Sequence, residues 1–214
     1  MHLIFGGTFD PIHHGHLRLA VELKEQLAVE RVALVPCHIP PHRAQPGATS
    51  VDRLRLLSLA VADEPGLAVD NRELAREGAS YTADTLRQLR EELGPQVPIA
   101  MVVGTDAFAT FDRWRDWRSI PGLAHIIVVD RPGAELSPDS EASALLRSRG
   151  VSSARQLHEQ PYGLMLSLAP PLLDISATGI RERIVQGRSP RYLLPESVWL
   201  EIRARGLYGY AGNT

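Results

Sequence analysis

The residues best suited to chemistry lie in the segment 6–16, where two glycines are followed by three closely spaced histidines. The apolar run 3–5 before it is typical of a strand, and a helix-type segment begins at about His14. Glycine lets the backbone approach a ligand closely, and a helix N-terminus presents N–H groups and a positive dipole end to an anion. The pattern therefore predicts a site for a nucleotide phosphate.

The spacing of the histidines indicates which of them would bind. His13 and His16 are three residues apart, so a helical chain would direct both imidazoles toward one ligand, whereas His14 would point elsewhere. For a single histidine, a capping or buried hydrogen-bonded role would be the simple alternative. Zinc is the alternative ligand for all three, but an obvious further zinc ligand is missing. We therefore expect His13 and His16 to contact a triphosphate, with no metal bound by the protein.

Other classes of protein fit the sequence poorly. The lysine-containing loop Gly-x-x-x-x-Gly-Lys-Ser/Thr and the dinucleotide loop Gly-x-Gly-x-x-Gly are both absent from this site. The formal net charge of -2 lacks the positive field that binding to nucleic acid or an anionic membrane requires. The single cysteine, Cys37, fits a reducing compartment. With neither a signal peptide nor a bilayer-spanning stretch predicted, we expect a cytoplasmic protein.

Short β-type runs alternate with longer helix-type segments along most of the chain. The β-type runs are 3–5, 32–35, 99–103 and 126–129, and the helix-type segments are 17–27, 52–62 and 82–93. This alternation indicates βαβ units, and the continuously apolar later runs indicate strands covered on both faces. We predict a Rossmann-like, doubly wound α/β fold with a mostly parallel sheet. It would form one domain over residues 1–214, with a C-terminal helical portion at about 177–210.

The complete run from Gly6 to Leu17, Gly-Gly-Thr-Phe-Asp-Pro-Ile-His-His-Gly-His-Leu, resembles the signature of the nucleotidylyltransferase superfamily in its nicotinate-mononucleotide form. Its shorter His-x-Gly-His core is shared with pantetheine-phosphate and cytidylyl-transferring relatives and, more loosely, with class I aminoacyl-tRNA synthetases. The full run is much more specific than this core. The resemblance implies that the segment binds ATP.

A second element, 175–181, resembles the family's Ile-Ser-Ser-Thr-x-Ile-Arg and precedes a helix-type segment. Ser176 and Thr178 can cap that helix while their hydroxyls and the adjacent N–H groups face phosphate. Arg181 can add a charge-assisted contact. Ala177 stands where the family usually has serine, so we expect the backbone contacts there to remain without that hydroxyl.

The segment 79–86 resembles the family's Ser-Tyr-Thr-x-Asp-Thr-Leu, which helps to hold a nicotinate ring through Tyr81 and Thr82. A helix N-terminus favours a carboxylate over a neutral amide, so nicotinate is expected in preference to nicotinamide. The segment 111–117 matches the family's spaced tryptophans. Within it, Trp117 is expected to stack on the pyridine ring.

Three further segments extend the resemblance over nearly the whole chain. Gly104 and Asp106 follow an apolar strand, at the edge where open α/β sheets bind ligands, and Asp106 can accept hydrogen bonds from ribose hydroxyls. The loop 36–43 resembles Pro-x-x-x-Pro-Pro-His-Lys, with Arg43 in place of the customary lysine and still a permanent cation. The segment 192–198 resembles the family's Tyr-Leu-Leu-Pro ending.

The resemblance implies transfer of the adenylyl group of ATP to nicotinate mononucleotide, giving deamido-NAD and pyrophosphate in NAD biosynthesis. The expected catalytic residues are His13, His16 and Arg181, with Mg²⁺ carried by ATP. The expected ATP contacts are Gly6, Gly7, Thr8, Phe9, His13, His16, Gly104, Asp106, Ser176, Thr178 and Arg181. The expected nicotinate mononucleotide contacts are Thr8, Arg43, Tyr81, Thr82, Asp106 and Trp117.

Two alternatives to this reaction stay open. The same chemistry could act on nicotinamide mononucleotide or on another phosphate acceptor, such as pantetheine phosphate. The chain could instead be a non-catalytic module that senses nucleotides. The expected partners are the two small-molecule substrates, without nucleic acid or membrane, and the oligomeric state is left open.

Overall fold

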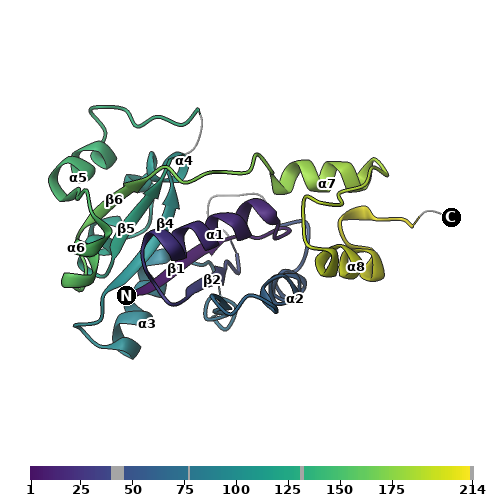
Figure 1. Cartoon of the computed structure of the whole chain (residues 1–214), viewed down its shortest axis with the longest axis horizontal. Helices are drawn as coiled ribbons and strands as arrows, with labels where there is room; N and C mark the ends of the chain where they lie inside the picture. Colours follow the sequence, from purple (N-terminus) through teal and green to yellow (C-terminus); the bar gives the residue numbers. More distant parts are fainter. Residues whose placement is uncertain (40–45, 77, 131–132, 213–214) are drawn as a thin grey trace.

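The computed structural model describes residues 1–39, 46–76, 78–130 and 133–212, and a six-stranded sheet forms its centre (Figure 1). The strands are β1 (His2–Gly7), β2 (Val32–Pro36), β3 (Leu67–Val69), β4 (Ile99–Gly104), β5 (His125–Val129) and β6 (Met165–Leu168). The α-helices are α1 (His14–Gln26), α2 (Ser50–Val61), α3 (Thr82–Leu93), α4 (Thr105–Phe108), α5 (Glu141–Arg149), α6 (Ala154–Glu159), α7 (Ala177–Val185) and α8 (Glu196–Arg205). The 3-10 helices are η1 (Phe111–Arg113), η2 (Trp117–Gly122) and η3 (Leu207–Gly209).

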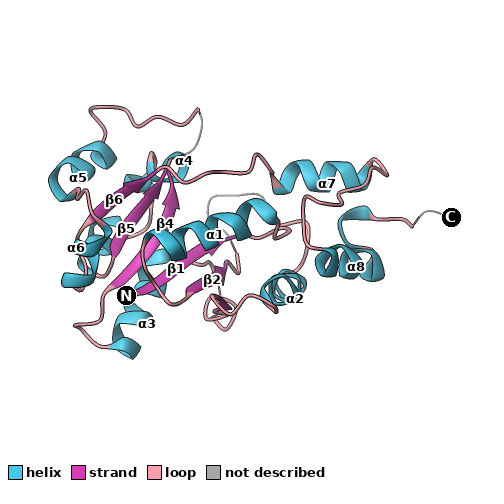
Figure 2. Ribbon diagram, in the orientation of Figure 1, coloured by secondary structure: helices cyan, strands magenta, loops and turns pink. Residues whose placement is uncertain are grey.

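All six strands are parallel and lie in the order β3-β2-β1-β4-β5-β6. Side chains alternate between the two faces of the sheet, so Leu3 and Phe5 join one buried cluster whereas Ile4 joins another. The first cluster includes residues of α1, α2, α7 and α8, and the second includes residues of α3, α4 and α5. Helices therefore cover both faces (Figure 2), and the predicted doubly wound α/β fold is confirmed.

The three helix-type segments predicted in the first half of the chain correspond to helices of the structure. The segments 52–62 and 82–93 correspond to α2 and α3, the segment 17–27 overlaps α1, and α1 begins at His14, where the sequence places the start of that helix. The first turn forms because the carbonyl of His13 accepts hydrogen bonds from the backbone N–H groups of His16 (3.0 Å) and Leu17 (3.1 Å). The elements β3, β6, α5 and α6 are not among the predicted ones, since short segments carry little periodicity.

The last part of the chain folds back onto the sheet domain. In Figure 1, α7 and α8 lie at the right-hand side, far from α5 and α6. The backbone N–H of His14 donates to the carbonyl of Leu193 (3.0 Å), and the hydroxyl of Ser197 donates to the carbonyl of Leu59 (3.3 Å). The C-terminal segment therefore contacts the start of α1, where the predicted phosphate site lies.

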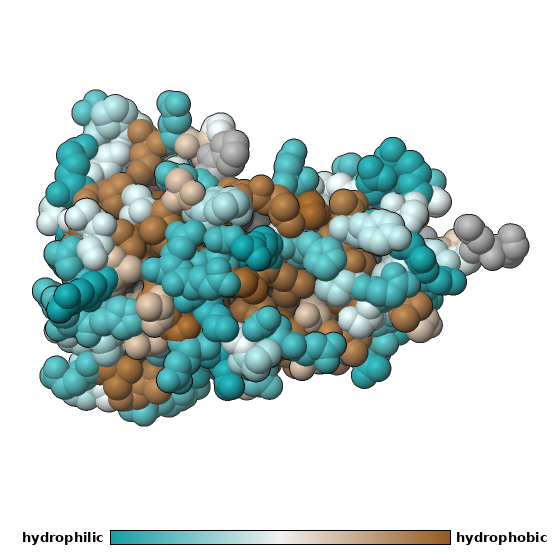
Figure 3. Space-filling model, viewed as in Figure 1, coloured by the Kyte–Doolittle hydropathy of each residue, from teal (hydrophilic) through white to brown (hydrophobic). Residues whose placement is uncertain are grey.

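The outer surface mixes polar and apolar side chains. On the face drawn in Figure 3, hydrophilic side chains cover much of the surface and hydrophobic ones gather in smaller patches between them. Across the described part of the chain, none of the helices has both the length and the apolar character needed to cross a bilayer.

Arg53 of α2 is a fully buried charged side chain that joins two loops at one edge of the sheet. Its guanidinium donates to the carbonyl of Thr8 (2.7 Å) and to the carbonyl of His38 (3.0 Å). Burial lowers the pKa of Arg53, while the nearby Cys37 and Asp10 favour its charged form. The hydrogen bonds to these two carbonyls offset part of the cost of burying the charge, and Arg53 thereby fixes the loops that follow β1 and β2 relative to each other.

His125, at the start of β5, is buried in its neutral form. Its Nδ1 accepts a hydrogen bond from the backbone N–H of Leu164 (3.1 Å), so its Nε2 carries the proton and donates to the carbonyl of Gln160 (2.9 Å). Protonation of Nδ1 would remove the acceptor of this hydrogen bond and bring the new N–H into close contact with the N–H of Leu164. Burial lowers the pKa of His125, in agreement with this arrangement.

We predict that His125 makes the fold sensitive to mild acid. Because its pKa is lower in the folded chain than in the unfolded chain, the neutral side chain stabilises the fold fully above about pH 6.5, and this contribution is lost as the pH falls below that value. The free energy of unfolding in urea should therefore fall less between pH 7.5 and pH 5 for His125→Asn than for the unchanged protein. Equal losses in the two proteins would contradict the prediction.

Candidate active site

The strand order reverses between β1 and β4, and the predicted site residues gather at the carboxyl edge of these two strands. The chain runs from β1 outward to β2 and β3, then crosses to β4 on the other side of β1. Both strands end in glycine, Gly7 and Gly104. Open α/β sheets bind ligands beyond the carboxyl ends of the strands at such a reversal. The expected position of Asp106, on α4 directly after β4, is therefore confirmed, and its side chain is exposed.

Gly7, the second glycine of the pair, is required by a close approach of the aromatic ring of Phe9. A Cβ atom on Gly7 would lie 2.8 Å from that ring, and the backbone of Phe9 has a left-handed φ of 49°. The Phe9 side chain turns back into the core and meets the ring of His16 edge to face, with centroids 5.1 Å apart. Gly7 therefore allows the loop to fold beneath His16. Gly6 lies exposed beside it, and Thr8 is half-buried.

The rings of His13 and His16 are stacked, with centroids 3.8 Å apart and an angle of 24° between their planes. His13 is buried and precedes α1 with an extended backbone (φ -149°), whereas His16 lies within the first turn and is half-buried. The sequence prediction that these rings face the same way is therefore correct, although the chain at His13 is not yet helical. A Cβ atom on Gly15 would lie 3.0 Å from the His13 ring, so the intervening glycine makes room for the stack.

The second predicted phosphate element, at the start of α7, lies directly beside the first. A Cβ atom on Gly15 would come within 3.4 Å of the carbonyl oxygen of Ile175, one residue before the cap of α7. The hydroxyl of Ser176 caps the helix by accepting the N–H of Gly179 at 3.1 Å. Thr178 is exposed in the first turn. The two elements, far apart in sequence, thus form one surface.

Arg181 connects α7 to the loop after β1. Its Nη1 donates to the carbonyl of Asp10 (2.7 Å) and lies 3.6 Å from the Asp10 carboxylate, while its Nη2 donates to the hydroxyl of Thr178 (3.3 Å). A guanidinium has five N–H donors, so these bonds leave others for a ligand. Arg181 is therefore held in place while part of its charge remains available to phosphate.

Asp10 is a residue of this region that sequence reasoning did not single out. Its carboxylate, almost completely buried, accepts the backbone N–H groups of Gly47 (2.7 Å) and Ala48 (3.1 Å). Its carbonyl accepts Arg181, as described above. Asp10 thus ties three segments together. Its position within the motif was visible in the sequence, but its partners come from distant segments.

Tyr208, in η3, is a second residue that the sequence analysis missed. It is buried, and together with Gly47, Asp52 and Arg181 it borders a hollow of about 550 Å³. Burial and the neighbouring Asp10 carboxylate raise the pKa of Tyr208 well above its ordinary value. The phenol therefore stays neutral beside Asp10, and the end of the chain closes one side of the region.

Arg43, predicted to contact phosphate, lies outside the described residues. The described part of the same loop is tied to the start of α3: the N–H of His38 donates to the hydroxyl of Ser80 (2.9 Å), and the N–H of Ser80 donates to the carbonyl of Ile39 (3.1 Å). The loop after β2 thus approaches the residues predicted to recognise the nicotinate ring.

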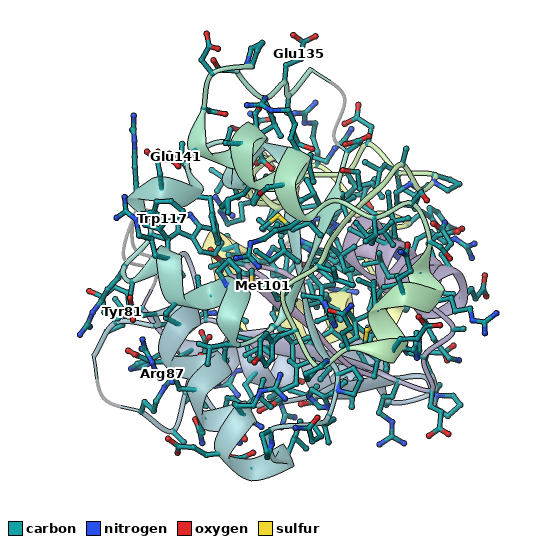
Figure 4. All side chains as sticks on the ribbon, turned by 90° about the vertical axis from the view of Figure 1, so that its left-hand side faces the viewer. Tyr81, Arg87, Met101, Trp117, Glu135 and Glu141 are labelled. Carbon is teal, nitrogen blue, oxygen red and sulfur yellow. The ribbon has the colours of Figure 1, made fainter. Side chains whose placement is uncertain are left out.

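Tyr81 and Trp117 lie on one side of the molecule, where α3 and η2 adjoin (Figure 4), and Thr82 follows Tyr81 directly in the chain. Tyr81 precedes α3, Thr82 is its first residue, and Trp117 begins η2. All three are half-buried, and the guanidinium of Arg115 lies 4.5 Å from the centre of the Tyr81 ring. The structure therefore brings the predicted ring contacts together.

Comparison with known proteins identifies the family of the chain. A sequence model of the cytidylyltransferase-like family matches residues 4–183. The probable nicotinate-nucleotide adenylyltransferase of Marinobacter nauticus is 66% identical over 98% of this chain and 97% of its own length. The corresponding protein of Chromohalobacter salexigens is 50% identical over 96% of this chain and 94% of its own length.

Solved structures show the same architecture. Plasmodium falciparum nicotinic acid mononucleotide adenylyltransferase, complexed with NaAD, resembles this chain with a TM-score of 0.73 over 97% of each chain. The two sequences are 15% identical, so this likeness concerns the fold alone. On the evidence of the family model and of the two similar sequences, the chain belongs to the cytidylyltransferase-like family and, within it, to the nicotinate-nucleotide adenylyltransferases.

Proposed function

We propose that this protein transfers the adenylyl group of ATP to nicotinate mononucleotide, forming deamido-NAD and pyrophosphate in NAD biosynthesis. The observation that carries the proposal is the meeting of the stacked His13 and His16 rings with the start of α7 at the carboxyl edge of β1. This arrangement offers imidazole groups, helix N–H groups and the Arg181 cation to a polyphosphate. The similar proteins named as nicotinate-nucleotide adenylyltransferases support the choice of reaction.

The reaction needs no nucleophile from the protein. A phosphate oxygen of nicotinate mononucleotide attacks the α-phosphorus of ATP in line and forms the new P–O bond. The bond from the α-phosphorus to the oxygen bridging toward the β-phosphate breaks, and pyrophosphate leaves with that electron pair. Catalysis then rests on placing the two substrates and on stabilising charge at the α-phosphate and on the leaving group.

We assign the stabilisation of charge to His13, His16 and Arg181, which the structure holds by ring stacking and by the bonds of Arg181 to Asp10. The start of α7 offers N–H groups to the phosphates of ATP. The proposed ATP contacts are those expected from the sequence: Gly6, Gly7, Thr8, Phe9, His13, His16, Gly104, Asp106, Ser176, Thr178 and Arg181. Ser176 uses its hydroxyl as a helix cap, so it would contact phosphate chiefly through the backbone.

The pyridine nucleotide would lie between α3 and η2. Trp117 would stack on the pyridine ring, and the N–H groups of Tyr81 and Thr82, at the start of α3, would receive the carboxylate of nicotinate. Asp106, exposed at the end of β4, would accept hydrogen bonds from ribose. Thr8 and Arg43 complete the proposed set of contacts.

Nucleotidyltransferases use a divalent metal ion with ATP, and we propose that the ion here is Mg²⁺. The described residues contain no group of three or more His, Cys, Asp or Glu side chains that could hold a metal. We propose that the ion enters with the phosphates of ATP. We further propose that residues 1–214 act as one domain in the cytoplasm.

Isotope transfer tests the proposed reaction. With ATP labelled at the α-phosphate and nicotinate mononucleotide, we expect the label in deamido-NAD, with equimolar pyrophosphate released, by chromatography. Calorimetry that detects ATP binding in a protein that releases no pyrophosphate would instead support the nucleotide-sensing alternative. Label transferred to another acceptor but not to nicotinate mononucleotide would refute the proposed substrate.

Replacing His16 tests the assigned catalytic role. His16→Ala should lower kcat by roughly 10²- to 10³-fold, because a donor directed at the transferring phosphate is lost. His14→Ala is the matched control, since the bond from His14 to Leu193 uses only the backbone and should persist. Circular dichroism should show both variants folded, and near-normal turnover of His16→Ala would refute the assignment.

A further inference from the structure

Two arginines of the segment 115–118 lie over the aromatic rings of the proposed pyridine site. The guanidinium of Arg115 is 4.5 Å from the centre of the Tyr81 ring, and that of Arg118 is 4.5 Å from the centre of the Trp117 ring. Both arginines are exposed, and neither forms an ion pair within the described part of the chain. Their positive charges therefore remain available to a ligand at these rings.

Two acidic side chains, Asp84 in the first turn of α3 and Asp116 directly before η2, are paired with another arginine. Arg87 of α3 pairs with Asp84 on its own helix (3.0 Å) and with Asp116 in front of η2. It also donates to the hydroxyl of Ser119 (3.2 Å), so it joins α3 to η2. Figure 4 shows Arg87 on the same side of the molecule as Tyr81 and Trp117. The two carboxylates share the guanidinium of Arg87, and within the described residues neither of them forms an ion pair with Arg115.

Two further charged side chains, just before the segment 115–118, have opposite charges. Asp112 and Arg113 are adjacent on η1, both exposed, and contribute no net charge together. Arg115 differs from Arg113 because only Arg115 lies over a ring of the proposed site. Arg113 is therefore a suitable control for Arg115, because it is a nearby exposed arginine that does not lie over a ring of the proposed site.

We propose that Arg115 is a specificity-determining residue that favours a pyridine ring carrying a carboxylate over one carrying a neutral amide. The inference rests on the proposed function and adds a side-chain cation to the N–H groups at the start of α3. Stacking on Tyr81 fixes the plane of the guanidinium while its N–H edge stays available, and that edge matches a carboxylate. A neutral amide gains little from the same charge, so Arg115 widens the difference between the two mononucleotides.

The test compares kcat/KM for nicotinate mononucleotide and nicotinamide mononucleotide in Arg115→Gln, Arg115→Lys and the control Arg113→Gln. Arg115→Gln should lower the nicotinate-to-nicotinamide ratio by roughly tenfold, through a higher KM for nicotinate mononucleotide at nearly unchanged kcat. Arg115→Lys should keep part of the ratio, because it keeps the charge but loses the planar N–H edge of the guanidinium. Arg113→Gln should match the unchanged protein. Raising the salt concentration should reduce the ratio of the unchanged protein more than that of Arg115→Gln.

The kinetic results distinguish a failure of this inference from a failure of the proposed function. If Arg115→Gln and Arg115→Lys lower kcat/KM by the same factor for both mononucleotides, Arg115 only supports the Tyr81 ring, and the inference is wrong. If the unchanged protein prefers nicotinate and Arg115→Gln retains that full preference, the inference fails while the proposed function stands. If the unchanged protein adenylylates neither mononucleotide, both fail. Because Arg115 is exposed, its replacement should leave thermal stability close to that of the unchanged protein, which a melting curve checks.

Discussion

Six parallel strands end at one edge of the sheet, and this constraint determines where chemistry can occur. The helices that follow the strands begin at that edge, so their N-termini and free N–H groups face the same side. Where the strand order reverses, between β1 and β4, the helices α1 and α4 that follow these strands pack on opposite faces of the sheet, the arrangement at which open α/β sheets bind ligands. The anion site proposed here therefore needs no basic surface on a protein with a net charge of only -2.

Asp10 holds together the segments that form the candidate site at this edge. Its carboxylate holds the backbone of Gly47 and Ala48, and its carbonyl holds Arg181 of α7. Arg53 likewise joins two segments, the loops after β1 and β2, through its hydrogen bonds to the carbonyls of Thr8 and His38. The histidine pair and the start of α7 depend on these buried links for their relative positions. Preorganisation of this kind lets a site stabilise charge without rearranging during the reaction.

The sequence predicted the sheet and the main motifs because these depend on local patterns. Apolar runs identified β1, β2, β4 and β5, and the spacing of His13 and His16 correctly anticipated that their rings face the same way. It did not predict β6, which has four residues, or the extended backbone at His13. The roles of Asp10 and Tyr208 could not be predicted either, because their contacts join segments that only the fold brings together.

The central claim is that the polyphosphate of ATP binds across the His13–His16 ring pair and the start of α7. A crystal structure with a non-hydrolysable ATP analogue tests this claim most directly. The account predicts phosphate oxygens within hydrogen-bonding distance of His13, His16 and Arg181, at the carboxyl edge of β1. Phosphates bound elsewhere, for example in the hollow of about 700 Å³ bordered by β6 and the start of α6, would contradict it.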